Sequence, residues 1–362
     1  MLAYLKFVGR LFKARFLNQR IPLIAILCVT NKCNLKCWYC YGEHPYRNNS
    51  LEFTKEELAG IITGLHDMGV QIVQLQGGEP LLRNDLKELV LQIKKQGMIC
   101  DLVTNGVLIP ERIETVRLLD TICISLDGPQ ELTDKNRGPG IFVRAVEGIT
   151  CACAQNLPVR LSAVLTKATK KSDIDWLIHF AEDKGVLVNF SPFFQFKPQF
   201  SSSRAEDFNI DEPQLRDLLH YIAGRKRGKA PIQFTAASYE AAAAWPFPFS
   251  GGKRREEILD AAYVKLKGKC RHGDLVVFID SDGSVYPCCN FWGEAKLNIR
   301  KQGIKKAILG VERDGCESCY IPAYIDRNSF FNGQPGVWLN YLNQGISRLR
   351  LKKFRKVKTN AK

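Results

Sequence analysis

The sequence has 362 residues, 45% of them hydrophobic, and carries a formal net charge of +15. A chain of this length and apolar content can bury a large core, sufficient for one large domain and a smaller one. Its longest apolar run, residues 21–29, is too short to span a bilayer, and no secretory signal precedes its 13 cysteines. The composition therefore argues against a transmembrane protein and against a secreted disulfide protein. The cysteines are expected to be reduced metal ligands in the cytoplasm.

The first 20 residues predict a basic amphipathic helix. Lys6, Arg10 and Lys13 would lie opposite the apolar positions, with Arg15 breaking the pattern. This profile is typical of a helix in a membrane interface, and a helix packed on the end of a domain would show the same pattern. The apolar face comprises Met1, Tyr4, Leu5, Val8, Leu11, Phe12 and Phe16.

Six short apolar runs alternate with amphipathic stretches between residues 21 and 194. This alternation predicts an α/β fold, a partial (β/α)6 TIM-like barrel with functional residues on the loops after its strands. Thr54 is the expected N-cap of the first helix, and Glu57 completes its capping box. The predicted strands are Ile21–Thr30, Val70–Gln76, Ile99–Val103, Thr121–Leu126, Val159–Leu165 and Val186–Phe190, and the predicted helices are Thr54–Met68, Asn84–Gln96, Glu111–Leu119, Phe142–Gln155 and Asp173–Lys184.

Beyond residue 194 the periodic pattern weakens. Residues 213–227 predict a helix, and residues 236–249 combine an alanine-rich stretch with alternating Pro and Phe. The predicted divisions are residues 1–20 for the N-terminal helix, 21–230 for the barrel core, 231–265 for a linker or substrate-facing insertion, 266–325 for a small C-terminal α+β domain and 326–362 for a basic tail.

Three cysteines, Cys33, Cys37 and Cys40, stand on the loop after the first predicted strand. Three thiolates can bind three irons of a four-iron cluster and leave the fourth iron open. Zinc is the alternative, but a structural zinc site needs four ligands. The C-x3-C-x2-C spacing, with an aromatic residue before the last cysteine, resembles the signature of the radical SAM enzymes, in which S-adenosylmethionine (SAM) chelates the open iron.

The loops after the next three strands extend this resemblance. Gly77, Gly78 and Glu79 belong to a GGEP sequence, which in radical SAM enzymes holds the methionine amino group of SAM, and two glycines let a backbone approach a ligand closely. Polar residues also follow the third and fourth strands. By resemblance, Asn105, Ser125 and Asp127 would bind the ribose and carboxylate of SAM, and Tyr39 would lie against the adenine. Arg137 matches the end of a further family element whose usual first residue, His, is Thr133 here.

A second cysteine set comprises Cys270, Cys288, Cys316 and Cys319. Two strands, 275–279 and 284–286, are predicted between the first two of these cysteines and form a hairpin. Four cysteines, two of them in a C-x2-C pair, can bind zinc as a ribbon. Their C-x12-G-x4-C and C-x2-C arrangement resembles the auxiliary-cluster domain called SPASM in its long form and twitch in its short form.

The resemblance implies the short form, because the sequence has no cysteine after Cys319. A second [4Fe-4S] cluster would then have all four irons bound by protein and would act as an electron conduit. Cys289 is a neighbouring thiol that could substitute as a ligand, although a bystander role is favoured.

Both ends of the sequence are cationic. No acidic residue precedes Glu43, and residues 347–362 contain eight Lys or Arg and no acid. Such ends indicate an anionic neighbour. Nucleic acid is disfavoured because only Phe354 interrupts the C-terminal basic run as a stacking platform. We therefore expect a cytoplasmic monomer with peripheral contact to the anionic inner face of a membrane.

The resemblance implies two [4Fe-4S] clusters, SAM, and a reductant partner such as flavodoxin or ferredoxin. It also implies reductive cleavage of SAM to a 5′-deoxyadenosyl radical, which abstracts hydrogen from a substrate carbon. The basic ends favour a lipid, lipid-linked glycan or cell-envelope precursor as substrate. The alternatives are the maturation of a ribosomally made peptide and the oxidation of a soluble sugar alcohol. Molybdopterin-precursor cyclases share the core but end in a glycine pair, whereas this sequence ends in Asn360, Ala361 and Lys362. Another substrate is therefore expected. No catalytic acid, base or radical-quenching residue is identified.

Overall fold

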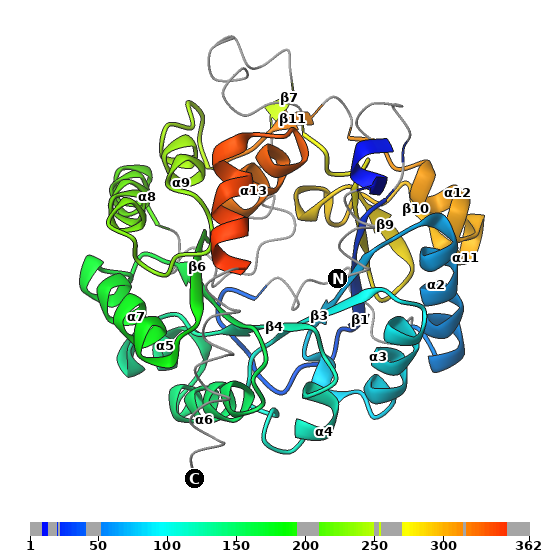
Figure 1. Cartoon of the computed structure of the whole chain (residues 1–362), viewed down its shortest axis with the longest axis horizontal. Coiled ribbons are helices and arrows are strands. Elements are labelled where there is room, and N and C mark those ends of the chain that lie inside the picture. The colour runs from blue at the N-terminus through cyan, green and yellow to red at the C-terminus, as the bar shows by residue number, and fades with distance from the viewer. Residues whose placement is uncertain are drawn as a thin grey trace.

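A nine-stranded sheet with helices around its outside forms the body of the computed structural model (Figure 1). The strand order is β10-β9-β8-β1-β2-β3-β4-β5-β6, and β1 to β6 run parallel to one another. These six units confirm the predicted α/β partial barrel. The six strands are β1 Ile24–Thr30, β2 Ile72–Gly77, β3 Ile99–Thr104, β4 Thr121–Ser125, β5 Val159–Leu165 and β6 Leu187–Pro192. The structure describes residues 9–13, 20, 22–40, 52–193, 210–249, 253–254, 270–313 and 316–345.

The two faces of the sheet differ in polarity. In β5, Leu161 and Leu165 are buried against the helices, while Arg160 and Ser162 alternate with them and are half-buried. Across the sheet, the Arg160 guanidinium lies 2.8 Å from the carboxylate of Asp101 on β3. The outer face therefore packs the core, and the inner face of the barrel carries polar side chains.

The helices between the strands follow the predicted order, with one addition. The capping box of the first is confirmed: Glu57 N donates to Thr54 Oγ1, and Thr54 N donates to the Glu57 carboxylate at 2.8 Å. The sequence did not predict α5, because Leu132 is its only buried apolar side chain and no periodic pattern results. The helices of this part are α2 Lys55–Met68, α3 Leu86–Lys95, α4 Ile113–Val116, α5 Gln130–Arg137, α6 Ile141–Ala154 and α7 Lys171–Lys184.

The predicted C-terminal hairpin consists of β8 Val276–Ile279 and β9 Ser284–Tyr286, which are antiparallel. Its strands extend the main sheet, because β8 pairs in parallel with β1 and β10 (Leu297–Asn298) pairs with β9. All four β8 residues are buried, and pairing with β1 satisfies the backbone of an edge that would otherwise be open. The C-terminal segment is thus built onto the barrel through shared strands.

Two predicted boundaries need correction in the described part of the chain. The segment beginning at 231, expected to be a linker or insertion, contains α9 (Ala236–Ala243) and the fully buried Trp245. The basic tail was predicted to begin at residue 326, but α13 (Pro322–Phe331) crosses that position. The buried carboxylate of Asp326 accepts hydrogen bonds from Thr235 and from Ser238 Oγ at 2.8 Å. Residues 326–345 therefore belong to the folded body. In the predicted N-terminal helix, linker, C-terminal domain and tail, residues 1–8, 14–19, 250–252, 255–269, 314–315 and 346–362 lie outside the described residues.

The remaining helices cover the last part of the barrel. Helix α13 packs against α9 and β6 (Figure 1). No helix in the described ranges is both long and apolar enough to cross a bilayer. The remaining elements are α8 Glu212–Arg227, β7 Lys253–Arg254, α11 Ile299–Gln302, α12 Ile304–Leu309, β11 Cys316–Ser318, the 3-10 turns η3 Pro80–Leu82 and η7 Cys289–Phe291, and a further helical segment, residues 335–345.

Candidate functional site

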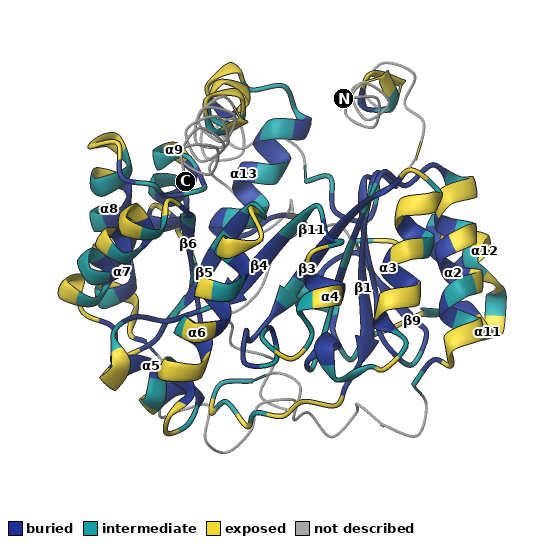
Figure 2. Ribbon diagram, turned by 60° about the horizontal axis from the view of Figure 1, so that its bottom comes forward, coloured by how far each residue is buried: buried dark blue, intermediate teal, exposed yellow. Residues whose placement is uncertain are grey.

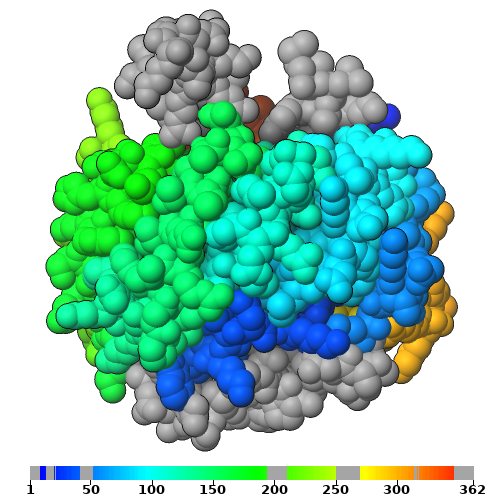
Figure 3. Space-filling view, turned by 90° about the horizontal axis from the view of Figure 1, so that it is seen from below, coloured from blue at the N-terminus to red at the C-terminus, as the bar shows by residue number. Residues whose placement is uncertain are grey.

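The loop with the first three cysteines follows β1 at the carboxyl edge of the parallel strands. Its thiols lie close enough to influence one another. Burial is the main cause that raises the pKa of Cys37 to about 12; the Arg137 guanidinium opposes this shift, and Cys40 and Cys33 contribute to it. Burial likewise raises the pKa of Cys33 to about 11. Without a cation these thiols stay protonated, so binding of iron must displace their protons. Seen from below, the blue part of the chain that includes this loop reaches the molecular surface (Figure 3).

The GGEP loop after β2 holds the start of the cysteine loop. Gly78 N donates to Thr30 O and Glu79 N to Lys32 O, both at 2.8 Å. A Cβ at Gly77 would lie 2.1 Å from Thr30 O, and one at Gly78 would lie 2.2 Å from Lys32 O. The glycines therefore permit contact between two stretches of backbone. The sequence had predicted that they make room for a ligand.

Replacing Gly78 with alanine is expected to displace the cysteine loop and to lower both the thermal stability and the iron content of the reconstituted protein. The clash is with a backbone oxygen and cannot be relieved by a side-chain rotation. Gly60→Ala is the matched control, because nothing lies within 4 Å of its added methyl group. This control lies inside α2 and should gain stability, by about 1 kcal/mol. Equal iron content in the two variants would contradict the role assigned to Gly78.

Glu79 is fully buried where β2, β3 and the cysteine loop meet. Its carboxylate accepts hydrogen bonds from Thr104 Oγ1 at 2.8 Å, Asn105 N at 2.8 Å and Leu81 N at 3.0 Å. Burial raises its pKa to about 7, against the effect of these three donors. The group is thus held in place, and a buried carboxylate with a raised pKa is typical of a functional site.

Asn105 and Ser125 lie at the carboxyl ends of β3 and β4. Asn105 Nδ2 donates to Asn34 Oδ1 at 2.8 Å and lies 3.9 Å from Cys33 Sγ. Ser125 ends β4 beside Ser162 of β5. The structure therefore brings Glu79 and Asn105 to the cysteine loop and places Ser125 on the same edge of the sheet.

Asp127 has a role that the sequence did not reveal. Its side chain is fully buried and accepts two hydrogen bonds from Arg137 at 2.9 Å and one from Tyr39 Oη at 2.7 Å. Asn136 Nδ2 and Val164 N also donate to it. Protein donors engage both oxygens, and the predicted contact of Asp127 with SAM stays a prediction.

The ion pair of Asp127 and Arg137 also positions the cysteine loop. Tyr39 lies between Cys37 and Cys40 in sequence, and its hydroxyl is fixed by Asp127. The Arg137 guanidinium lies 5.6 Å from the centre of the Tyr39 ring, and Phe193 meets that ring edge-on at 6.4 Å. Tyr39 is therefore held by protein groups. The predicted contact of Tyr39 with adenine stays a prediction.

The second cysteine set gathers at the opposite end of the sheet. Cys270 precedes β8 and Cys288 follows β9, so both lie near the amino end of β8. Burial raises the pKa of Cys288 well above its ordinary value, and the thiols of Cys289, Cys270, Cys316 and Cys319 raise it further. Because β1 has seven residues at about 3.3 Å each, roughly 20 Å of strand separates this end from the first cysteine loop.

The fifth thiol of this region has its own partner. Tyr324 Oη donates to Cys289 Sγ at 3.2 Å, and the Tyr324 ring lies 4.1 Å from that of His272. Burial raises the pKa of Cys289 to about 11. Cys289 is thus held by a tyrosine, next to the four predicted ligands.

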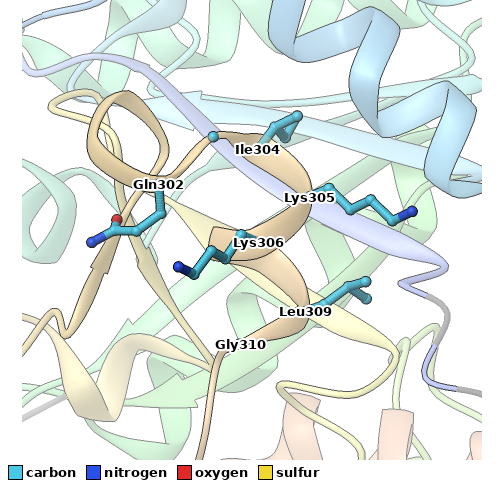
Figure 4. Close-up of a pocket in the computed structure, with 7 residues that line it drawn as sticks. Gln302, Ile304, Lys305, Lys306, Leu309 and Gly310 are labelled. Carbon is cyan, nitrogen blue, oxygen red and sulfur yellow. The ribbon is translucent and has the colours of Figure 1, made fainter.

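Two negative findings apply to the described part of the chain. No three Cys, His, Asp or Glu side chains there converge on one point as ligands of a single ion do. A hollow lined by α11, α12 and Gly310 contains none of the predicted site residues (Figure 4).

The fold and site define an α/β-barrel protein with a three-cysteine loop at the carboxyl edge of its strands. A family model described as the radical SAM superfamily matches residues 27–181. The GTP 3′,8-cyclase of Petrotoga mobilis is 30% identical over 315 residues, which cover 84% of this chain and 91% of that protein. The chain therefore belongs to the radical SAM superfamily, whose members use SAM and a [4Fe-4S] cluster, and it is an enzyme.

Other relatives match over a shorter stretch. The GTP 3′,8-cyclase of Campylobacter fetus is 28% identical over 202 residues, which cover 53% of this chain and 60% of that one. The chain spans about 60% of the length of several such relatives. SuiB of Streptococcus suis bound to S-adenosylmethionine has the same fold, with a TM-score of 0.61 and 20% identity over 82% of this chain and 68% of that one. The anSMEcpe structure with bound AdoMet has a TM-score of 0.57 and 18% identity, and the match covers 81% of this chain and 82% of that one.

Proposed function

We propose that this radical SAM enzyme binds two [4Fe-4S] clusters and abstracts hydrogen from a substrate held inside the barrel between them. The observation that carries the proposal is the presence of two separate groups of thiols, one at each end of β1 and β8. When bound, the first cluster supplies the electron that cleaves SAM. Cys33, Cys37 and Cys40 would hold it, and the barrel would exclude water and other hydrogen donors.

The residues around the first thiol group would hold SAM. Glu79 would receive the methionine amino group, because its buried carboxylate is fixed by three donors beside the loop. Asn105 lies against Cys33 and Asn34 and would contact SAM from the next strand. Gly77 and Gly78 act indirectly, through the cysteine loop, and Arg137 with Asp127 fixes Tyr39.

The second thiol group would hold the auxiliary cluster of a short, twitch-type segment. The mutual effect of Cys270, Cys288, Cys316 and Cys319 on the pKa of Cys288 supports this assignment. Four protein ligands leave no open iron, so this cluster would exchange electrons with the substrate radical and would not bind the substrate.

We propose a nucleotide as the substrate, with GTP as the first candidate. The likeness to a GTP 3′,8-cyclase covers 84% of this chain, whereas the expectation of a lipid or glycan rested on the basic ends and has no support among the relatives. The molybdopterin-precursor cyclases had been argued against only because the last three residues of the sequence lack a glycine pair.

The charge of one residue near the second thiol group also favours an anionic substrate. Arg327 on α13 buries an Nη1 group that has no acceptor among the described residues. Such a group is costly unless a ligand supplies an acceptor, and phosphate oxygens are suitable acceptors. Burial lowers the pKa of His272 and raises that of Tyr324, and the Arg327 guanidinium acts on both groups, which marks its position beside the second cysteine set.

Anaerobic incubation of the reconstituted full chain with SAM, a reductant and one substrate pool at a time tests this proposal. GTP is expected to stimulate the formation of 5′-deoxyadenosine, whereas peptide, lipid and sugar-alcohol pools should leave it at the background rate. Arg327→Gln should remove the stimulation by GTP and leave the background rate unchanged. Stimulation by one of the other pools but not by GTP would overturn the substrate assignment, and no deoxyadenosine under any condition would overturn the proposal as a whole.

A further inference from the structure

Exposed apolar side chains gather on the last described helical segment. Trp338, Leu339 and Leu342 are 41%, 58% and 60% exposed, and together they form an apolar face of residues 335–345. Their spacings of three and four residues place Leu339 and Trp338 beside Leu342 on one side of a helix. Scattered single apolar residues are common on protein surfaces, but a contiguous group of this kind marks a contact site.

This helical segment is fixed to the protein, in part through the unexposed portion of Trp338 itself. Trp338 Nε1 donates to Phe330 O at 2.8 Å, and the Phe330 ring lies 5.7 Å from Trp338 and 5.4 Å from Tyr341. The side-chain amides of Asn340 and Gln344 both donate to Gln233 O. The apolar face is therefore held outward by contacts to α13 and to the segment before α9.

The N-terminal helical residues 9–13 lie at the same end of the molecule. Leu11 is buried in one apolar cluster with Leu23, Leu275 and Phe331, and Phe12 is 60% exposed. Leu23 and Leu275 immediately precede β1 and β8, so this end is opposite the first cysteine loop. Figure 2 shows the short helical segment near the N-terminus and the region above α13 at one end of the barrel.

The N-terminal residues and the residues that follow the apolar face are both positively charged. Arg10 and Lys13 flank Phe12, no acidic residue precedes Glu43, and none follows Asp326. Eight Lys or Arg occur among residues 347–362, directly after the apolar face. A short apolar helix face beside a polybasic segment is typical of proteins that bind the surface of an anionic bilayer.

We propose that this end of the barrel docks on an anionic lipid bilayer, with Phe12, Trp338, Leu339 and Leu342 entering the interface. Tryptophan and leucine suit the boundary between headgroups and acyl chains, and the basic ends supply attraction to anionic headgroups. Two copies joined through this face would bring like charges together. The first cysteine loop, at the opposite end of β1, would face away from the bilayer. The proposal is independent of the substrate.

Sedimentation of the purified full-length chain with vesicles tests the docking surface. Binding is expected to vesicles of phosphatidylcholine with phosphatidylglycerol and to be at least about tenfold weaker to phosphatidylcholine alone, as expected for several basic residues near a charged surface. Leu339→Ser with Leu342→Ser should weaken binding to the anionic vesicles by at least about tenfold, because each leucine buries one large apolar side chain.

Two controls make the result specific. Leu91→Ser with Val143→Ser removes exposed apolar side chains of 47% and 58% exposure from α3 and α6, away from this end, and should leave vesicle binding within about twofold. Circular dichroism should show both variants folded. Equal binding of both variants would overturn the proposal, as would a preference for RNA over anionic vesicles. A dimer that dissociates in the Leu339→Ser, Leu342→Ser variant would also overturn it. Formation of deoxyadenosine without vesicles is a separate measurement, so failure of docking is distinguishable from failure of the radical chemistry.

Discussion

Replacing Cys37 with alanine is expected to reduce the formation of 5′-deoxyadenosine from SAM to background. Its thiol interacts with both Cys33 and Cys40, and two remaining thiols cannot bind three irons. The loss should be at least about 100-fold, above the 10–100-fold typical of residues that only surround a ligand. Anaerobic reconstitution with iron and sulfide, followed by chromatography of the products with an excess of reductant, measures it.

Two other cysteine variants test whether this loss is specific. Cys151→Ala removes a half-buried thiol from α6 and should change neither bound iron nor deoxyadenosine. Cys319→Ala should lower bound iron from about eight to about four per chain and retain cleavage of SAM, since only the first set supplies the open iron. Normal turnover in Cys37→Ala would refute the role of the first loop. About four irons with one zinc in the unmodified protein would refute the second cluster.

Replacing Arg137 with methionine is expected to lower the free energy of unfolding by about 3–5 kcal/mol. The guanidinium and the Asp127 carboxylate are 7% and 0% exposed and share two hydrogen bonds of 2.9 Å. The substitution leaves a buried carboxylate without its counter-charge. Urea unfolding of the protein without iron measures the loss, and the iron content after reconstitution should fall as well, because Tyr39 loses its fixed position within the cysteine loop.

An exposed ion pair provides the matched control for this prediction. Arg117 pairs with Glu114 on α4, and their side chains are 54% and 57% exposed. Arg117→Met should therefore cost less than about 1 kcal/mol. In the double variant Asp127→Asn, Arg137→Met, the loss should be smaller than the sum of the single losses by about 0.5–3 kcal/mol. Additive losses would show that the two groups do not stabilise the fold as a pair.

Local features of the fold were predictable to within a few residues. The strand at 159–165 was predicted with its observed bounds, and both residues of the Thr54–Glu57 capping box were predicted. Both depend on neighbours within a few positions in sequence, namely the period of two in a strand and a cap three residues from its partner. Helix α5 was not predicted, because most of its buried side chains are polar and are buried by residues from other elements.

The candidate site was predictable in composition but not in its contacts. The spacing of Cys33, Cys37 and Cys40 and the GGEP sequence were sufficient to indicate the superfamily. The role of Asp127 could not be predicted, since its partners Tyr39 and Val164 are 88 and 37 positions away in sequence. Similarly, the glycines of the GGEP loop face a backbone segment more than 40 positions earlier, a contact that no local pattern records.

The sequence by itself determined the order of the barrel units, the two cysteine sets and the sign of the charge at both ends, because each is a property of neighbouring residues. The tertiary structure decided where these features lie. Pairing of β8 with β1 placed the second cysteine set at the far end of the sheet from the first. Packing of α13 onto α9 and β6 brought residues 326–345 into the folded body and turned Leu339 and Leu342 outward. These outcomes depend on long-range pairing and burial, whose free energies are set by partners distant in sequence.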